Sequence, residues 1–241
     1  RTVQREGNNS QQLFLYSILF ISVCIIYTVI GILVLLNNSK TQGSKSFFVL
    51  IVAVNIWSIG LGFATAAPDA VTSEFWRRIS SVGWGTVFAI ILHFTLIVTG
   101  NGTLIKKWWS RLLLYLPAAV CILAFVIPSS LNSTPYNLQQ TQFGWINVPM
   151  NNFWDWFFYA YYIGYLVATL VLVMRWGKRT LSYNIKMQSY FIFLSFSGTL
   201  LLASITDVFI SDIPQMAPII LVIPIVITYR AIVKYGCTES K

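Results

Sequence analysis

Long apolar runs constrain this chain more than any other feature of its sequence. Seven runs are almost free of charge, and each is about 20 residues long, the length at which a helix crosses roughly 30 Å of hydrocarbon. The runs are continuously apolar and do not alternate with a period of two, so they predict helices and exclude barrel strands. We therefore predict an all-α integral membrane bundle with spans at residues 13–36, 46–67, 79–99, 112–131, 156–174, 187–206 and 213–233.

The runs also predict the domain organisation. Residues 1–12 form a short leading tail, residues 13–235 form one seven-transmembrane domain, and residues 236–241 form a trailing tail. The remaining residues are scattered over short loops and the two tails, so no soluble catalytic domain of ordinary size fits among them. We expect any cytoplasmic output module to be missing from this sequence or to belong to a separate protein.

Charge in the loops predicts which end of the bundle faces the cytoplasm. Twelve basic residues and one acidic residue fall on one side, a net charge of +11, whereas four basic and six acidic residues fall on the other, a net charge of −2. The positive-inside rule then places the N-terminus outside and the C-terminus in the cytoplasm. Because the basic residues are spread over short loops instead of forming one patch, we expect no nucleic-acid partner.

Aromatic side chains concentrate at the start of the fifth span. Trp154, Phe158, Tyr161 and Tyr165 recur every three or four residues, a spacing that places them on one face of a helix. Such a stripe is typical of a wall around an aromatic or amphiphilic ligand. More often, a stripe of this kind is an aromatic belt at the membrane surface combined with helix packing.

The outer loop of residues 132–155 is the longest segment outside the spans. It contains no Lys or Arg and carries Trp145 among Asn and Gln residues. A loop of this length in a compact protein often covers a binding site. The alternative is an irregular connector whose aromatic residues lie at the headgroup level.

Two ionisable residues are further candidates for a ligand site. His93, the only histidine, lies inside the third span, where an ionisable group is by default a functional candidate. The simpler interpretation is a neutral imidazole hydrogen-bonded to a neighbouring helix. Asp207 lies near the outer end of the sixth span, where it is either solvated or supplies negative charge at the mouth of an outward cavity.

Three prolines distinguish the seventh span, namely Pro214, Pro218 and Pro224. Each removes a backbone hydrogen bond and favours a kink. The kinks make this span a candidate element for passing movement to the cytoplasmic tail, or else a static feature.

Residues for catalysis or metal binding are sparse. One histidine and three dispersed cysteines do not supply a zinc site, and the serines of the sixth span lack the G-x-S-x-G pattern. The last span contains no lysine between Ile213 and Tyr229 for a retinal cofactor. We therefore expect no enzyme activity, no metal and no cofactor.

Two sequence blocks carry a resemblance to a known family. The first comprises Phe75-Trp76-Arg77-Arg78, Gly83-Trp84 and Leu92-His93-Phe94, and the second is Tyr229-Arg230-Ala231-Ile232-Val233-Lys234-Tyr235. Together with seven spans, they resemble the N-terminal seven-transmembrane sensory region of bacterial histidine kinases, which also precedes diguanylate cyclase modules. The resemblance extends from Leu13 to Tyr235. It implies a receptor in the bacterial plasma membrane, a homodimer, and a cytoplasmic kinase module in the same or a separate chain.

The leading hypothesis is therefore a sensory domain that binds a small or amphiphilic molecule, in contact with membrane lipid. The predicted ligand-binding residues are Trp84, His93, Trp145, Trp154, Phe158, Tyr161, Tyr165 and Asp207, and the predicted relay residues are Pro218, Pro224, Arg230 and Tyr235. The alternative is a small seven-helix transporter, although spans one to three and five to seven show no internal repeat.

Overall fold

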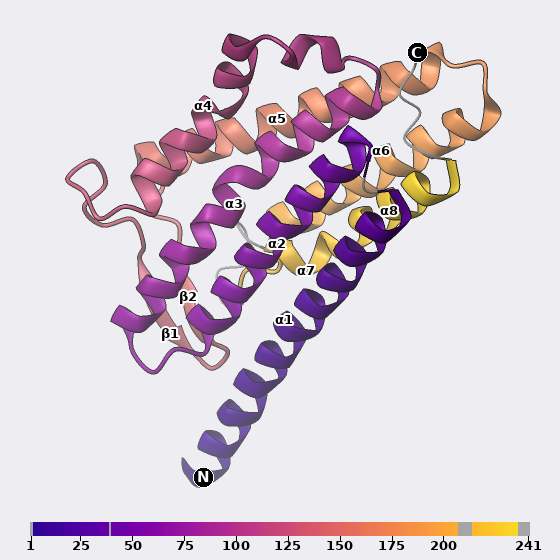
Figure 1. Ribbon diagram of the computed structural model, residues 1–241. Coiled ribbons are helices and arrows are strands. Elements are labelled where there is room, and N and C mark those ends of the chain that lie inside the picture. The colour runs from indigo at the N-terminus through magenta and orange to yellow at the C-terminus, as the bar shows by residue number, and fades with distance from the viewer. Residues whose placement is uncertain (1, 39, 207–213, 236–241) are drawn as a thin grey trace.

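The computed structural model describes residues 2–38, 40–206 and 214–235, which form a helical bundle (Figure 1). Within these residues, six helices are long and apolar enough to cross a membrane. They are α1 (Thr2–Asn38), α2 (Gln42–Thr65), α3 (Ala70–Val98), α4 (Trp108–Phe125), α5 (Phe153–Arg179) and α6 (Tyr183–Ser204). The prediction of an all-α membrane bundle is confirmed.

The seventh helix is broken and shorter than the predicted span of residues 213–233. It consists of α7 (Ala217–Ile220) and α8 (Val222–Tyr235), separated by a turn at Leu221. Pro224 explains the break, because it has no N–H to donate to the carbonyl of Ile220 and its ring crowds that carbonyl.

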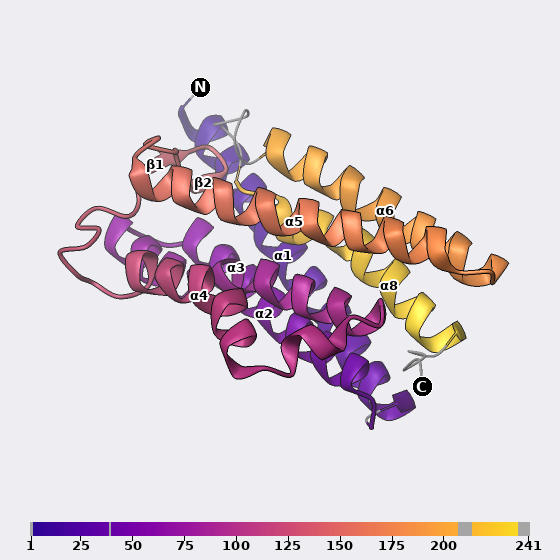
Figure 2. The same ribbon diagram turned by 90° about the horizontal axis from the view of Figure 1, so that it is seen from above.

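Successive helices alternate in direction and give the bundle two distinct ends. The hairpin end holds the α2–α3 turn and a short β-hairpin, whereas the basic end holds the α1–α2 turn, the 3₁₀ helix η1 (Gly102–Ile105), the α5–α6 turn and the end of α8 (Figures 1 and 2). Lys40, Lys106 and Arg179 lie in or beside the turns of the basic end. The assignment of the basic end to the cytoplasm stays a prediction.

A short β-hairpin forms part of the outer loop of residues 132–155, for which the sequence allows either a cover over a binding site or an irregular connector. Strands β1 (Leu138–Thr141) and β2 (Gly144–Asn147) are antiparallel, with Leu138 opposite Asn147 and Thr141 opposite Gly144. Gly144 has a φ of 105°, a left-handed conformation that glycine adopts without strain. The hairpin closes over the bundle through Ile146, which is buried.

Helices α2 and α3 pack closely because small and hydroxyl-bearing side chains line their contact. The Ser80 hydroxyl donates to the Trp57 carbonyl at 3.1 Å, and Ser73 donates to the Ala64 carbonyl at 2.8 Å. A Cβ atom added at Gly83 would lie 2.5 Å from the carbonyl oxygen of Ala53. Small residues of this kind allow backbones to approach in a membrane, where the hydrophobic effect does not drive helices together.

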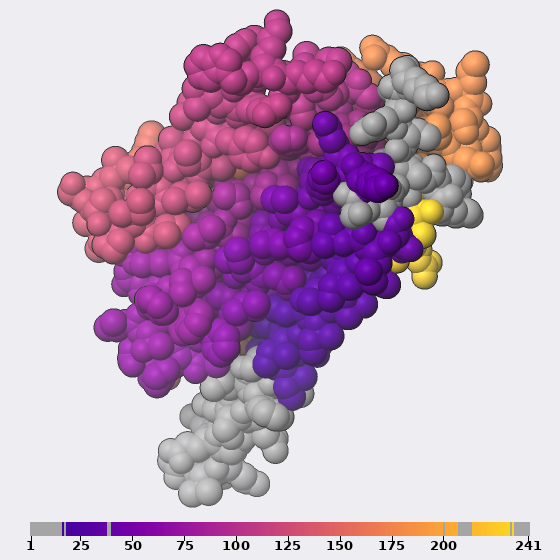
Figure 3. All heavy atoms as spheres, viewed as in Figure 1, coloured from indigo at the N-terminus to yellow at the C-terminus, as the bar shows by residue number. Residues whose placement is uncertain are grey.

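The outer face of α1 is apolar and exposed, as expected for a surface that contacts lipid. The exposed residues recur along one face, and α1, α2 and α3 lie side by side on the side of the molecule shown in Figure 3. These exposed residues are Ile18, Ile21, Ile25, Val29, Ile32 and Leu36. The opposite face of α1 packs into the core through Phe20, Tyr27 and Val34.

Candidate functional site

A cavity of about 140 Å³ lies between α3, α5, α6 and the broken seventh helix. It extends from the aromatic core of the bundle towards the hairpin end, where Asn147 and Pro149 border it. Aromatic rings dominate its walls, and they come from five helices, α2 to α6. These rings are Trp57, Trp84, Phe88, Phe125, Phe158, Tyr159, Tyr162 and Phe196, together with Tyr136 from the loop before the hairpin.

One face of α5 supplies much of the wall. Asp155, Phe158, Tyr162 and Leu166 are spaced by three or four residues and all line the cavity. Phe158 packs edge-on against Trp84, with 4.5 Å between ring centroids, an arrangement that aromatic pairs favour. This face of α5 therefore presents aromatic side chains to the cavity, with the Asp155 carboxylate at the N-terminal end of the helix.

Arg77 closes the polar end of the cavity. Its side chain is only 3% exposed, although it begins close to the hairpin end of α3. Its Nη2 donates to the carbonyl oxygen of Trp145 at 2.9 Å, and its Nη1 donates to the amide oxygen of Gln215 at 3.3 Å. Its Nε is buried without a hydrogen-bond partner. Arg77 thus joins α3, the hairpin and the entry to α7 through neutral acceptors.

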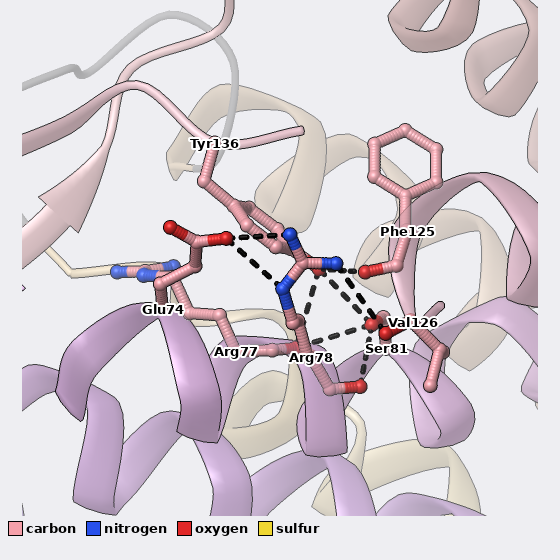
Figure 4. Close-up of polar contacts among 7 residues, drawn as sticks. All are labelled: Glu74, Arg77, Arg78, Ser81, Phe125, Val126 and Tyr136. Carbon is pink, nitrogen blue, oxygen red and sulfur yellow. Dashed lines mark hydrogen bonds and ion pairs between the residues drawn. The ribbon is translucent and has the colours of Figure 1, made fainter. Parts of the chain in front are cut away.

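Arg78, the next residue, has a different environment (Figure 4). Its Nε donates to Glu74 Oε1 at 2.9 Å, and its Nη1 reaches the Val126 carbonyl at 3.4 Å. In Figure 4, the side chains of Arg77 and Arg78 are directed to opposite sides, and that of Arg77 is directed away from Val126. The two arginines therefore differ in charge compensation: in the described residues Arg78 has a carboxylate partner, and Arg77 has none.

Tyr136 fixes the loop before the hairpin to α3 and α4. Its hydroxyl donates to the Phe125 carbonyl at 3.1 Å and lies 3.0 Å from the Ser81 hydroxyl (Figure 4). Burial raises the pKa of the Tyr136 phenol well above its ordinary value, although the Ser81 hydrogen bond and the charges of Arg77 and Arg78 oppose the shift. The phenol is therefore neutral at any physiological pH.

The predicted stripe on α5 does not act as one wall. Phe158 lines the cavity, as does Trp84 on α3. Tyr161 instead donates to the Gly85 carbonyl at 3.1 Å, and Tyr165 donates to the Leu114 carbonyl at 3.0 Å, so both hydroxyls join α5 to neighbouring helices outside the cavity lining. Trp154 is also outside it, with its Nε1 bonded to the Leu131 carbonyl at 3.0 Å.

The other predicted ligand residues are dispersed. The indole Nε1 of Trp145 donates to the Ala67 carbonyl at 2.9 Å, so its ring anchors the hairpin and only its backbone carbonyl reaches Arg77. The Nδ1 atom of His93 lies 2.8 Å from the Tyr115 hydroxyl on α4, which matches the interpretation of an interhelical hydrogen bond. His93 does not line the cavity. Asp207 lies outside the described residues.

The predicted relay residues lie along the broken seventh helix. The carbonyl oxygen of Pro218 accepts a hydrogen bond from the hydroxyl of Tyr27, which is fully buried on α1. Pro224 is buried in α8, Arg230 is exposed, and α8 ends at Tyr235. Ala217 and Leu221 from the same segment border the cavity.

One family matches nearly the whole chain. Residues 18–240 match the N-terminal 7TM region of histidine kinase. The chain belongs to this family. It is therefore a multi-pass sensory domain of the bacterial cell membrane. The family implies association with a histidine kinase module. A comparison with curated proteins found no match. The family does not favour the transporter alternative.

Sequence reasoning missed the polar end of the cavity in this 7TM sensory domain. In the sequence, Arg77 stands out only as part of the block Phe75-Trp76-Arg77-Arg78. The available signal was the pair Arg77-Arg78 within the first turns of a span, because adjacent residues on a helix point about 100° apart and cannot share one partner. Gln215 carried no comparable signal, since it lies outside the regular helices.

No metal centre is formed by the part of the chain that the structure describes, where His, Cys, Asp and Glu side chains do not gather in groups of three. Cys24 and Cys121 are free thiols. Cys237 lies outside the described residues.

Proposed function

We propose that this 7TM sensory domain binds a small molecule in its central cavity and that occupancy changes the packing of α7 and α8, which regulates the histidine kinase module. One observation carries the proposal. The cavity is bordered both by the long helices α3 and α5 and by Ala217 and Leu221 of the broken seventh helix. A ligand there contacts the segment that leads to the basic end.

The seventh helix is suited to adopt two arrangements. Its break at Leu221 leaves α7 joined to α1 through the Tyr27–Pro218 hydrogen bond, while α8 packs through Ile225 and Thr228. A ligand shifts such an equilibrium only by its difference in affinity between the two arrangements, and each tenfold difference corresponds to about 1.4 kcal/mol. Contacts with Ala217 and Leu221 supply that difference if the segment moves.

Filling the cavity tests this proposal. Ala203 on α6 lines the cavity, so Ala203→Phe adds a ring inside it, whereas Ala160→Phe adds the same ring on the exposed face of α5. We expect a several-fold change in autophosphorylation for Ala203→Phe, measured in membrane vesicles containing the full-length protein. Ala160→Phe should match the wild type. Equal output from all three proteins at equal membrane levels would refute the proposal.

The proposal requires the hairpin end outside and the basic end in the cytoplasm. Leu181 in the α5–α6 turn and Leu131 near the hairpin are both exposed. In a cysteine-free background, a membrane-impermeant thiol reagent should label Leu131→Cys in intact cells, and it should label Leu181→Cys only after the cells are opened. The reverse pattern would rule out relay from an outer ligand to a cytoplasmic kinase.

We also propose a homodimer, because histidine kinases act as dimers, and lipid contact along the exposed face of α1. Light scattering of the protein in detergent measures its oligomeric state. A monomer at all protein concentrations would contradict the homodimer.

A further inference from the structure

We propose that the cavity binds a small organic anion, a carboxylate attached to one compact apolar group such as a single aromatic ring. Arg77 and Gln215 would hold the carboxylate, and Trp84, Phe88, Phe158 and Tyr162 would surround the apolar group. This inference rests on the proposed function and specifies the ligand class for the same cavity.

The charge of Arg77 carries the first step. A buried cation is costly unless it is paired, and the two groups that bind the Arg77 guanidinium are a backbone carbonyl and the Gln215 amide, both neutral. The guanidinium has five N–H donors, and its Nε is buried without a partner. An anion at this end of the cavity forms charge-assisted hydrogen bonds with a group that otherwise lacks a counter-charge within the described residues.

The neighbouring carboxylates are engaged elsewhere. Asp155 borders the cavity, but its Oδ2 accepts hydrogen bonds from the backbone N–H groups of Met150 at 3.0 Å and Asn152 at 3.4 Å, as part of the N-terminal capping box of α5. Glu74 is paired with Arg78. Neither Asp155 nor Glu74 forms an ion pair with Arg77, so its guanidinium is available to a ligand.

The volume of the cavity sets the size of the apolar group. A volume of about 140 Å³ is close to that of an engineered apolar protein cavity of about 150 Å³ that binds benzene. The ring contacts Trp84–Phe158 and Phe88–Tyr162, at 4.5 and 5.5 Å between centroids, leave an aromatic surround in which another ring packs edge-on or offset. A long acyl chain exceeds this volume.

Three probes with the same ring separate charge from shape. Phenylacetate carries the anion, phenylacetamide is its neutral isostere, and 2-phenylethylamine carries a cation. We expect wild-type full-length protein in lipid nanodiscs to bind phenylacetate about 10- to 100-fold more tightly than phenylacetamide by calorimetry, from the usual strength of hydrogen bonds between charged groups. The cation should bind most weakly.

Variants assign the selectivity to Arg77. Arg77→Gln should remove the preference for phenylacetate over phenylacetamide, and Gln215→Leu should reduce it. Arg78→Gln is the matched control, because Arg78 is paired with Glu74 and does not line the cavity; it should keep the preference. If Arg77→Gln fails to fold, the wild-type probe series and Gln215→Leu still decide the question.

The outcomes separate this inference from the proposed function. Equal binding of the three probes, no binding of any probe, or undiminished selectivity in folded Arg77→Gln would each overturn the inference. An altered kinase output in Ala203→Phe together with equal probe binding would leave the proposed function standing without the inference. Anion-selective binding with a kinase output that responds neither to phenylacetate nor to Ala203→Phe would support the binding site and refute the proposed function.

Discussion

Replacing Gly83 with alanine probes the close contact between α2 and α3. A Cβ atom at this position would lie 2.5 Å from both the carbonyl oxygen of Ala53 and the backbone nitrogen of Trp57, and 2.8 Å from the Trp57 Cβ. An ordinary contact begins at 3.4 Å, so the shortfall is about 0.9 Å. Two of the three obstructing atoms belong to the backbone, so the helices must move apart.

That separation sets the expected cost. Forcing one methyl group into a packed helix contact typically costs about 1–3 kcal/mol. It also stretches the nearby hydrogen bond from the Ser80 hydroxyl to the Trp57 carbonyl, now 3.1 Å long. We expect Gly83→Ala to lower the free energy of unfolding by about 1–3 kcal/mol and the unfolding temperature by roughly 2–12 °C. Titration with denaturing detergent in mixed micelles, followed by circular dichroism, measures the first quantity.

Gly164→Ala is the matched control. Gly164 lies on the exposed face of α5, and a Cβ atom added there meets nothing within 4 Å. Because alanine has a higher helix propensity than glycine, this variant should be unchanged or more stable by about 0.5–1 kcal/mol. The reasoning is refuted if Gly83→Ala is as stable as Gly164→Ala.

Three further predictions concern single hydrogen bonds and one ionisation. Tyr27→Phe removes the hydroxyl that donates to the Pro218 carbonyl and should lower the free energy of unfolding by about 1 kcal/mol, measured by the same titration; no loss would show that this contact is not formed. Trp145→Phe removes the indole donor to Ala67 and should speed amide hydrogen exchange in the hairpin while leaving α5 unchanged. The pKa of Tyr136 is raised by burial, so its neutral phenol contributes stability below the unfolded-state pKa of about 10 and this contribution is lost as the pH rises through the folded-state value. Tyr136→Phe should therefore reduce the alkaline loss of stability, and an unchanged pH profile would contradict the assigned environment.

The helices were predictable because the cost of placing charge in hydrocarbon leaves a direct mark on the sequence. The runs at residues 46–67 and 187–206 correspond closely to α2 and α6. The hairpin left no such mark, since β1 is four residues long and contains two glutamines. Its turn at Gly144 is local, but the burial of Ile146 depends on the folded bundle.

The cavity was predictable only in part. Helical periodicity predicted a shared stripe of aromatic residues on α5, but it did not indicate which neighbouring helix each residue contacts, and only Phe158 of the stripe lines the cavity. Tyr161 and Tyr165 were selected for their spacing, yet their hydroxyls bond to α3 and α4. The lining residue Tyr162 lies one position away. The outcome depends on the rotation of α5, which is set by tertiary contacts such as the hydrogen bonds of Tyr161 and Tyr165 to neighbouring helices.

The distance between α1 and α8 at the basic end tests the central claim most directly. Leu36 and Val233 are both exposed near the ends of these helices, so spin labels at Leu36→Cys and Val233→Cys report on the seventh helix in a cysteine-free background. With the cavity filled by Ala203→Phe, double electron–electron resonance in nanodiscs should show a shifted distance distribution, whereas Ala160→Phe should leave it as in the parent. Identical distributions in all three folded proteins would mean that the cavity and the end of α8 are not coupled.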